Sequence, residues 1–213
     1  MGFAYVEKGE IKISKFRKFE TFYREYRKAL KKWGKTSDFI IHFRMSTHGT
    51  DKGLFNVHPF KVSEELVFAH NGMIYDVETD VKKSDTQMFN KTILRNLKPN
   101  FLKSNAVCTL IEGFIGTDKL VFLNNKGRSV ILNEGNGHWE GGVWFSNHSY
   151  RQYKTYKPST TYHGMGYGWN EDVKIPQTRA FNSCGYQVDT PKKDVKKTGN
   201  CLFYVFFGGV YLI

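Results

Sequence analysis

The apolar positions of the chain repeat with two different spacings, and the change of spacing marks the predicted elements. Residues 3–16 alternate in two short runs around Lys8-Gly9, which is typical of a β-hairpin. From Phe19 onward the apolar residues recur every three or four positions until Gly34, which predicts an amphipathic helix ending there. The residues expected on its core face are Phe19, Phe22, Tyr23, Tyr26, Leu30 and Trp33.

Apolar runs after this helix predict strands that flank a central helical block. Ser84 stands as N-cap of one helix with Gln87 at its third position, which is the signature of a capping box. The other predicted elements are strands at 38–44 and 66–70, a helix at 104–116, a hairpin at 119–134 with an Asn-Asn-Lys-Gly turn, and a strand at 142–147. This order predicts an α+β fold in which an antiparallel-rich sheet is packed by helices.

The character of the sequence changes after Tyr150. Residues 1–150 are expected to form one domain, and residues 151–213 a loop-rich C-terminal extension of unknown role. The last 13 residues, "CLFYVFFGGVYLI", are the longest apolar run and predict a buried strand pair or hairpin. The alternatives are an exposed, aggregation-prone end and a reading-frame artefact.

Composition and charge narrow the class of protein. Apolar residues make up 40% of the 213 residues, which is a globular composition, and no apolar stretch is long enough to span a membrane. Without a signal-peptide pattern or paired cysteines, we expect a cytoplasmic protein with no disulfide framework.

The net charge is +12, and residues 7–36 hold eleven Lys and Arg against four Glu. Since the helical spacing assigns the aromatic residues there to the core, the pattern favours a solvated basic face over nucleic-acid binding.

Three polar features stand where predicted elements end or begin. Arg44 closes a strand and is suited either to an internal salt bridge or to a ligand carboxylate. Asn71-Gly72 closes the next strand and is either a tight turn or a pair of donors for an oxyanion. Asp85 opens a capped helix, where it either stabilises the helix or meets an ammonium group. Together these groups complement an α-amino acid whose side-chain amide is to be broken.

Histidines suggest a metal site as an alternative. His42, His48, His58 and His70 lie at long spacings, and no acidic residue accompanies them at helical spacing. We therefore expect no metal and no cofactor.

Four short motifs in order resemble the class II glutamine amidotransferases, the glutaminase domains of the N-terminal-nucleophile hydrolases. They are "HFRMSTHG" at 42–49, "NVHPF" at 56–60, "AHNGMI" at 69–74 and "SDT" at 84–86. The match covers about residues 1–150. The chain is similar to small single-domain members of the family carried by bacteriophages, which would place the protein in the host cytoplasm.

The resemblance implies a role for each matching position. Arg44 would bind the α-carboxylate of glutamine and Asp85 its α-ammonium group, Asn71 and Gly72 would hold the oxyanion, and Thr47 and His48 would shape the pocket wall. The implied fold is a four-layer αββα sandwich of two antiparallel sheets between helices, here N-terminally incomplete.

The family's nucleophile is a cysteine at the first position of the mature chain, and its free α-amine is taken as the base. This sequence begins Met-Gly-Phe, so we expect either that Met1 is an internal methionine of a longer protein or that the chain is a truncated, inactive form. Cys108 is expected on the inward side of a helix, and Cys184 and Cys201 lie outside the matching region.

The resemblance thus predicts hydrolysis of the glutamine side-chain amide to glutamate and ammonia in the full-length form. Glutamine is then the partner molecule, with a possible separate enzyme as ammonia acceptor and no membrane or nucleic-acid partner. The alternatives are a non-catalytic ligand-binding or interaction protein on the same fold and a basic nucleic-acid-binding protein.

Overall fold

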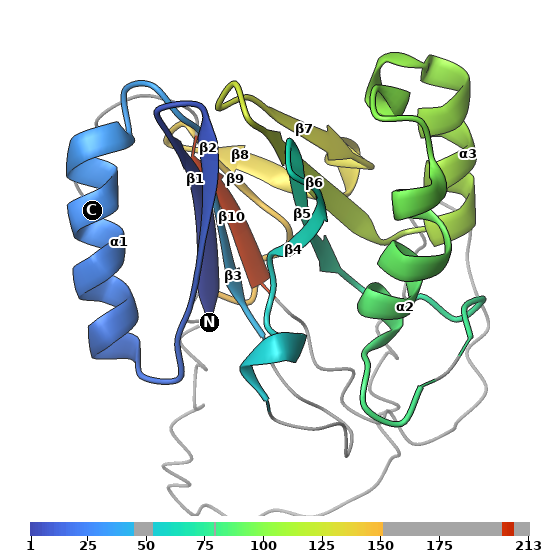
Figure 1. The fold of residues 1–213 in the computed structure, drawn as a ribbon, viewed down its shortest axis with the longest axis horizontal. Helices are drawn as coiled ribbons and strands as arrows, with labels where there is room; N and C mark the ends of the chain where they lie inside the picture. Colours follow the sequence, from blue (N-terminus) through green and yellow to red (C-terminus); the bar gives the residue numbers. More distant parts are fainter. Residues whose placement is uncertain (45–52, 79, 151–201, 207–213) are drawn as a thin grey trace, which may run out of the picture. The chain divides into compact units, whose positions relative to one another are not determined.

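The described part of the chain folds into two antiparallel β-sheets and three α-helices (Figure 1). The computed structural model describes residues 1–44, 53–78 and 80–150 and the backbone of 202–206. All of these elements belong to one compact unit, made of Met1–Arg151 and Gly199–Ile213. The predicted α+β class with antiparallel sheets is confirmed.

The first sheet is antiparallel throughout, and its strand order is β2-β1-β3-β10-β9-β8. The strands of this sheet are β1 (Gly2–Glu7), β2 (Glu10–Lys15), β3 (Phe39–Phe43), β8 (His138–Glu140), β9 (Val143–Phe145) and β10 (Leu202–Phe206). The hairpin predicted over residues 3–16 is confirmed as β1 and β2, and Lys8 and Gly9 in its turn both have positive φ, 51° and 82°.

Strand β10 joins the C-terminal part of the chain to this sheet. Its backbone pairs with β3 on one side, from Leu202 opposite Phe43 to Phe206 opposite Phe39. On the other side it pairs with β9, where Tyr204 lies opposite Phe145. A strand was expected in this apolar run, whereas its insertion between two strands of the N-terminal part was not. Residues 207–213 lie outside the described residues.

The second sheet has the order β4-β5-β6-β7. The predicted β6–β7 hairpin is confirmed, and Asn124 Oδ1 organises its turn by accepting hydrogen bonds from the backbone of Lys126 and Arg128. Strand β4 was not among the predicted strands, because it alternates exposed and half-buried residues after Phe60 and carries little apolar signal. The strands are β4 (Phe60–Ser63), β5 (Leu66–Asn71), β6 (Lys119–Asn124) and β7 (Ser129–Leu132).

The helices are α1 (Phe19–Trp33), α2 (Asp85–Thr92) and α3 (Asn105–Ile115). Ser84 caps α2 as predicted, since its Oγ accepts a hydrogen bond from the Gln87 backbone at 3.3 Å. The reciprocal half of the predicted capping box does not form. The Gln87 side chain donates to the carbonyl of Phe55, and the Ser84 backbone donates to Asn56 Oδ1 at 3.1 Å.

Three apolar clusters hold these elements together, because successive residues of each strand point to opposite faces. Helix α1 covers one face of the first sheet through Phe22, Tyr26 and Ala29. The two sheets face each other across a cluster that includes Ile40 of β3 and Val67 of β5. Helices α2 and α3 pack on the second sheet, with Phe89 and Ile111 in that cluster (Figure 1).

The predicted core face of α1 is only partly buried. Phe22 and Tyr26 are 2% and 7% exposed, whereas Phe19 and Tyr23 are 52% and 45% exposed. The expectation that Phe19 and Tyr23 are core residues is therefore wrong. Their rings stack on each other at the rim of the apolar stripe, with centroids 5.9 Å apart.

Among the described residues, no helix combines the length and the apolar character that a membrane span needs.

Candidate active site

Strand β5 ends in two adjacent polar residues whose side chains point to opposite faces of the second sheet. His70 and Asn71 are both buried, with 2% and 6% of their surface exposed. Since side chains alternate along a strand, His70 faces helix α2 while Asn71 faces the first sheet. Their hydrogen-bond partners confirm this division.

The Asn71 side chain is oriented by Ser146, which directly follows β9. Asn71 Nδ2 donates to Ser146 Oγ at 2.6 Å, in a buried contact between the two sheets. Ser146 is itself fully buried. The bond fixes the amide plane of Asn71 at the end of its strand.

His70 connects β5 to the start of helix α2 and to the loop before β6. Its Nδ1 lies 3.0 Å from Thr86 Oγ1, and its Nε2 lies 3.0 Å from Asp118 Oδ2. The Thr86 hydroxyl also contacts Asp85 Oδ1 at 3.3 Å. A continuous series of polar contacts thus runs from Asp118 through His70 and Thr86 to Asp85.

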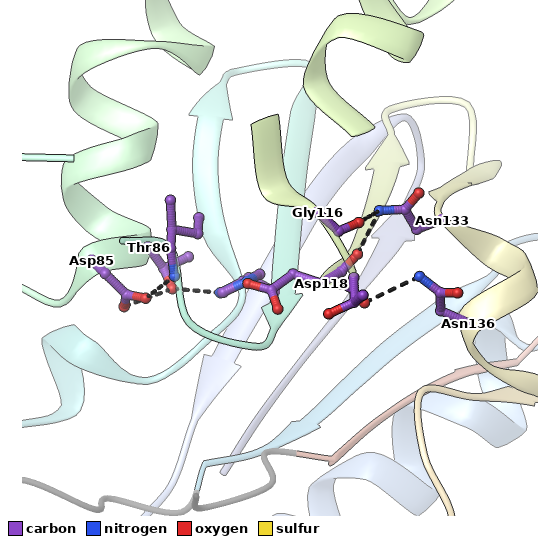
Figure 2. Close-up of polar contacts among 9 residues, drawn as sticks. Asp85, Thr86, Gly116, Asp118, Asn133 and Asn136 are labelled. Atoms are coloured by element: carbon purple, nitrogen blue, oxygen red, sulfur yellow. Dashed lines mark hydrogen bonds and ion pairs between the residues drawn. The ribbon is translucent and has the colours of Figure 1, made fainter. Parts of the chain in front are cut away.

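Asp118 is held in place by asparagines that follow β7 (Figure 2). Asn133 Nδ2 donates to the carbonyls of Gly116 and Asp118, at 2.9 and 2.8 Å. Asn136 Nδ2 donates to the carbonyl of Thr117 at 3.1 Å. These bonds fix the backbone of the loop, so the Asp118 carboxylate reaches His70 from a rigid support.

Gly72 occupies a position that only glycine fits. Its φ is +143°, and a Cβ built there would lie 1.9 Å from the Asp118 carboxylate. Glycine therefore permits both the backbone turn after β5 and the close approach of Asp118.

Asp85 is the first residue of α2 and lies next to the turn after β5. Its Oδ2 accepts a hydrogen bond from the Ile74 backbone at 2.8 Å. Since Ile74 is two residues beyond Gly72, this bond ties the carboxylate of Asp85 to the segment that follows Asn71-Gly72.

The end of β3 carries a buried histidine. The His42 ring lies against the His58 ring, with centroids 4.1 Å apart, and His70 acts on it electrostatically. Burial lowers the pKa of His42 to about 3, and the positive charges of the Met1 amine and Arg44 act in the same direction. Burial also holds the pKa of His58 well below its ordinary value. Both rings are therefore neutral at pH 7.

Arg44 directly follows β3, two residues beyond His42. Its charge contributes to the lowered pKa of the Met1 amine, of His42 and of His58. The electrostatic field of Arg44 therefore reaches the residues at the end of β3. The structure thus brings the segments that carry Arg44, Asn71-Gly72 and Asp85 to neighbouring positions. Thr47 and His48, the predicted pocket wall, lie outside the described residues.

Ser146, Thr86 and Asp118 were not among the predicted site residues. Only Thr86 carried a local signal, because it directly follows Asp85 in the "SDT" motif. Within the described ranges, no three His, Cys, Asp or Glu residues are grouped as metal ligands.

No family model, curated protein or solved structure matches the chain.

We call the ends of β3 and β5 and the start of α2 the candidate edge. This edge carries a guanidinium, an acidic side chain at a helix N-terminus and an oriented amide beside a glycine. A guanidinium binds carboxylates and a carboxylate binds ammonium groups. A fixed amide with a neighbouring glycine is suited to hold a carbonyl oxygen on which negative charge develops.

Proposed function

We propose that this edge binds free glutamine. Arg44 takes the α-carboxylate, Asp85 takes the α-ammonium group, and Asn71 with the Gly72 backbone takes the side-chain carbonyl oxygen. The observation that carries the proposal is the hydrogen bond from the Ile74 backbone to Asp85, since it ties the start of α2 to the segment that holds Asn71 and Gly72.

We also propose that the chain is a type-2 glutamine amidotransferase-like domain with the four-layer αββα sandwich of N-terminal-nucleophile hydrolases. The order of the three apolar clusters supports this, because helix α1, the first sheet, the second sheet and helices α2 and α3 follow one another. The four motifs that resemble the family begin on β3, just before β4, on β5 and at the N-cap of α2.

In this role the full-length form of the domain, with its N-terminal cysteine, hydrolyses the glutamine amide to glutamate and ammonia in the cytoplasm. A separate enzyme would then use the ammonia. Asn71 and Gly72 stabilise the oxyanion of the tetrahedral intermediate, an effect worth about 3–4 kcal/mol per donor in other hydrolases.

Isothermal titration calorimetry with L-glutamine tests the binding site. Asp85→Asn keeps an oxygen that accepts from the Ile74 backbone but removes the negative charge, and we expect it to weaken binding about 10- to 100-fold. Arg44→Ala is expected to weaken binding at least as much. Arg24→Ala and Glu64→Gln, which alter exposed side chains, are the matched controls and should leave the affinity unchanged. Unchanged affinity in the Asp85 and Arg44 variants contradicts the proposal.

Binding without hydrolysis is the second candidate. It is favoured by one observation: the one cysteine whose side chain the structure describes, Cys108, lies on α3 and donates to the carbonyl of Leu102, 3.7 Å away. Release of glutamate from bound glutamine distinguishes the two candidates.

A further inference from the structure

The outer surface of helix α1 combines exposed aromatic rings with a high density of positive charge. The helix packs on the face of the first sheet that points away from the second sheet, so its own outer side faces neither sheet (Figure 1). Phe19 and Tyr23 are 52% and 45% exposed. The sequence pattern disfavoured a nucleic-acid partner because it assigned these rings to the core, and their exposure removes that reason.

The positive charge of α1 and its flanks exceeds what neighbouring acidic residues neutralise. Residues 17–35 carry eight Lys and Arg, all of them exposed, against two Glu. Ion pairs with Glu7 and Glu25 occupy three of these cations. The cations that form no ion pair with a described residue are Arg17, Lys18, Arg27, Lys31 and Lys35. Such a surplus attracts a polyanion.

One row of side chains on α1 brings the exposed rings and these cations together. Residues four apart are neighbours on a helix surface, and the row that we call the α1 ridge consists of Phe19, Tyr23, Arg27 and Lys31. The rings of Phe19 and Tyr23 stack with centroids 5.9 Å apart. The Arg27 guanidinium lies over the Tyr23 ring, 5.7 Å from its centroid, and its Nη1 donates to the Tyr23 hydroxyl at 3.3 Å. The ridge is about 18 Å long.

A single-stranded nucleic acid has the chemistry that fits both halves of the ridge. Its unpaired bases stack on aromatic rings and on guanidinium groups, and its phosphates attract Lys and Arg. A duplex keeps its bases stacked on one another, so it could use the cations but not the rings. An anionic membrane would need the apolar face of the helix, which Phe22, Tyr26 and Ala29 bury against the first sheet.

We infer that the α1 ridge binds single-stranded nucleic acid, with bases stacked on its two rings and phosphates held by its two cations and their neighbours. This inference goes beyond the proposed function and does not depend on it. The ridge is separate from the candidate edge, because α1 packs on the outer face of the first sheet, whereas Asn71 contacts Ser146 between the two sheets.

Fluorescence anisotropy with a labelled oligothymidine of about 12 nucleotides tests the inference on the full chain. We expect binding at about 50 mM salt that weakens steeply as the salt concentration rises, because neutralised phosphates release their counterions. Phe19→Ala combined with Tyr23→Ala should weaken binding about 10-fold or more with an unchanged salt dependence. Tyr23→Phe keeps the ring and should bind within about twofold of the wild type.

The two cations of the ridge are tested through the salt dependence itself. Arg27→Gln combined with Lys31→Gln should weaken binding and reduce the slope of log Kd against log salt concentration by about 1.4. Lys91→Gln combined with Lys98→Gln removes two exposed cations from α2 and the segment after it, and this matched control should keep both the affinity and the slope. All of these substitutions alter exposed side chains, and circular dichroism of each variant checks that it folds.

Four outcomes overturn the inference. The wild type does not bind the oligothymidine at about 50 mM salt. The variant with both alanines binds it as tightly as the wild type. A duplex of the same length binds as tightly as the single strand, which would show a surface for any polyanion. The protein binds phosphatidylserine vesicles but not the oligothymidine, which would assign the ridge to a membrane surface.

Discussion

At the scale of single residues, the end of β5 shows how alternation lets two neighbours perform different tasks. His70 organises the helix side through Thr86 and Asp118, while Asn71 reaches Ser146 across the sandwich. A shift of register by one residue would exchange these environments and break both sets of contacts.

Some of these residues could be found in the sequence and others could not. Arg44, Asn71-Gly72 and Asp85 stand at the ends of predicted elements, so their polarity is visible against an apolar background. Ser146 and Asp118 contact their partners over sequence separations of 75 and 48 residues. Local pattern holds no information about such contacts, since they depend on how the two sheets stack.

Ser146→Ala should destabilise the protein and lower the rate at which it releases glutamate from glutamine. The substitution leaves the buried Asn71 amide without its oxygen partner, which costs about 1–3 kcal/mol of unfolding free energy. Urea denaturation measures this cost, and glutamate release is expected to fall with it because Asn71, the proposed oxyanion donor, loses its orientation. Ser149→Ala, an exposed neighbour, is the control. Equal stability of the two variants would show that the bond has no role.

Gly72→Ala should be among the most damaging small substitutions in the chain. The added methyl group meets the Asp118 carboxylate at 1.9 Å in a backbone conformation with φ of +143°. We expect a loss of more than about 2 kcal/mol in unfolding free energy. Gly113→Ala is the matched control, because it lies inside α3 with no atom within 4 Å of the new Cβ and should stabilise the helix by about 1 kcal/mol. A tolerated Gly72→Ala would contradict the described packing of Asp118.

At the scale of elements, strong periodicity predicted structure well and weak periodicity did not. Helices α1 and α3, the β1–β2 and β6–β7 hairpins and strand β5 all follow clear apolar patterns. Strands β4 and β8 were missed because both are short and mostly exposed, and backbone pairing rather than burial defines them. In α1 the apolar stripe is wider than the surface it covers, so Phe19 and Tyr23 remain at the rim.

Helix α1 offers a test of this division between core and rim. Phe22 packs edge-on against Phe3 and Phe43, with ring centroids 5.7 and 5.1 Å apart, and its replacement by alanine should cost about 3–5 kcal/mol. Phe19→Ala should cost less than about 1 kcal/mol, since half of that ring is exposed. Chemical denaturation of both variants measures the difference. Similar losses at the two positions would show that the helix packs with a different face.

At the scale of the whole molecule, the class of fold could be predicted but the topology could not. The order of strands and helices indicated α+β, because each element is a local feature. The insertion of β10 between β3 and β9 depends on pairing between residues more than fifty positions apart, as in Tyr204 opposite Phe145. An apolar run at the end of a chain predicts burial without saying which strands it joins.

The buried histidines between the sheets predict how stability depends on pH. In the folded protein His42 and His58 stay neutral far below their ordinary pKa of 6.5, whereas in the unfolded chain they take up protons near that value. The unfolded state then binds more protons, so the unfolding free energy should fall as the pH drops from 7 towards 4. The expected slope is about 1.4 kcal/mol per pH unit for each histidine.

The variant His58→Phe tests the origin of this slope, which the neighbouring Lys15, Arg44, His42 and His70 also influence. Urea denaturation at pH 7, 6 and 5 should show a shallower dependence in the variant than in the wild type. His148→Gln, at an exposed position, should leave the slope unchanged. A slope that is the same in His58→Phe and in the wild type would assign the pH dependence to other groups.

The central claim is that Asp85 and the α-ammonium group of glutamine contact each other. A cycle of binding measurements tests it most directly, with wild type and Asp85→Asn each titrated with L-glutamine and with 4-carbamoylbutanoate, which lacks the ammonium group. Loss of the ammonium group should weaken binding to the wild type by about 10-fold or more. It should change the affinity of Asp85→Asn by less than about twofold. An equal loss in both proteins would place the ammonium group elsewhere and contradict the account.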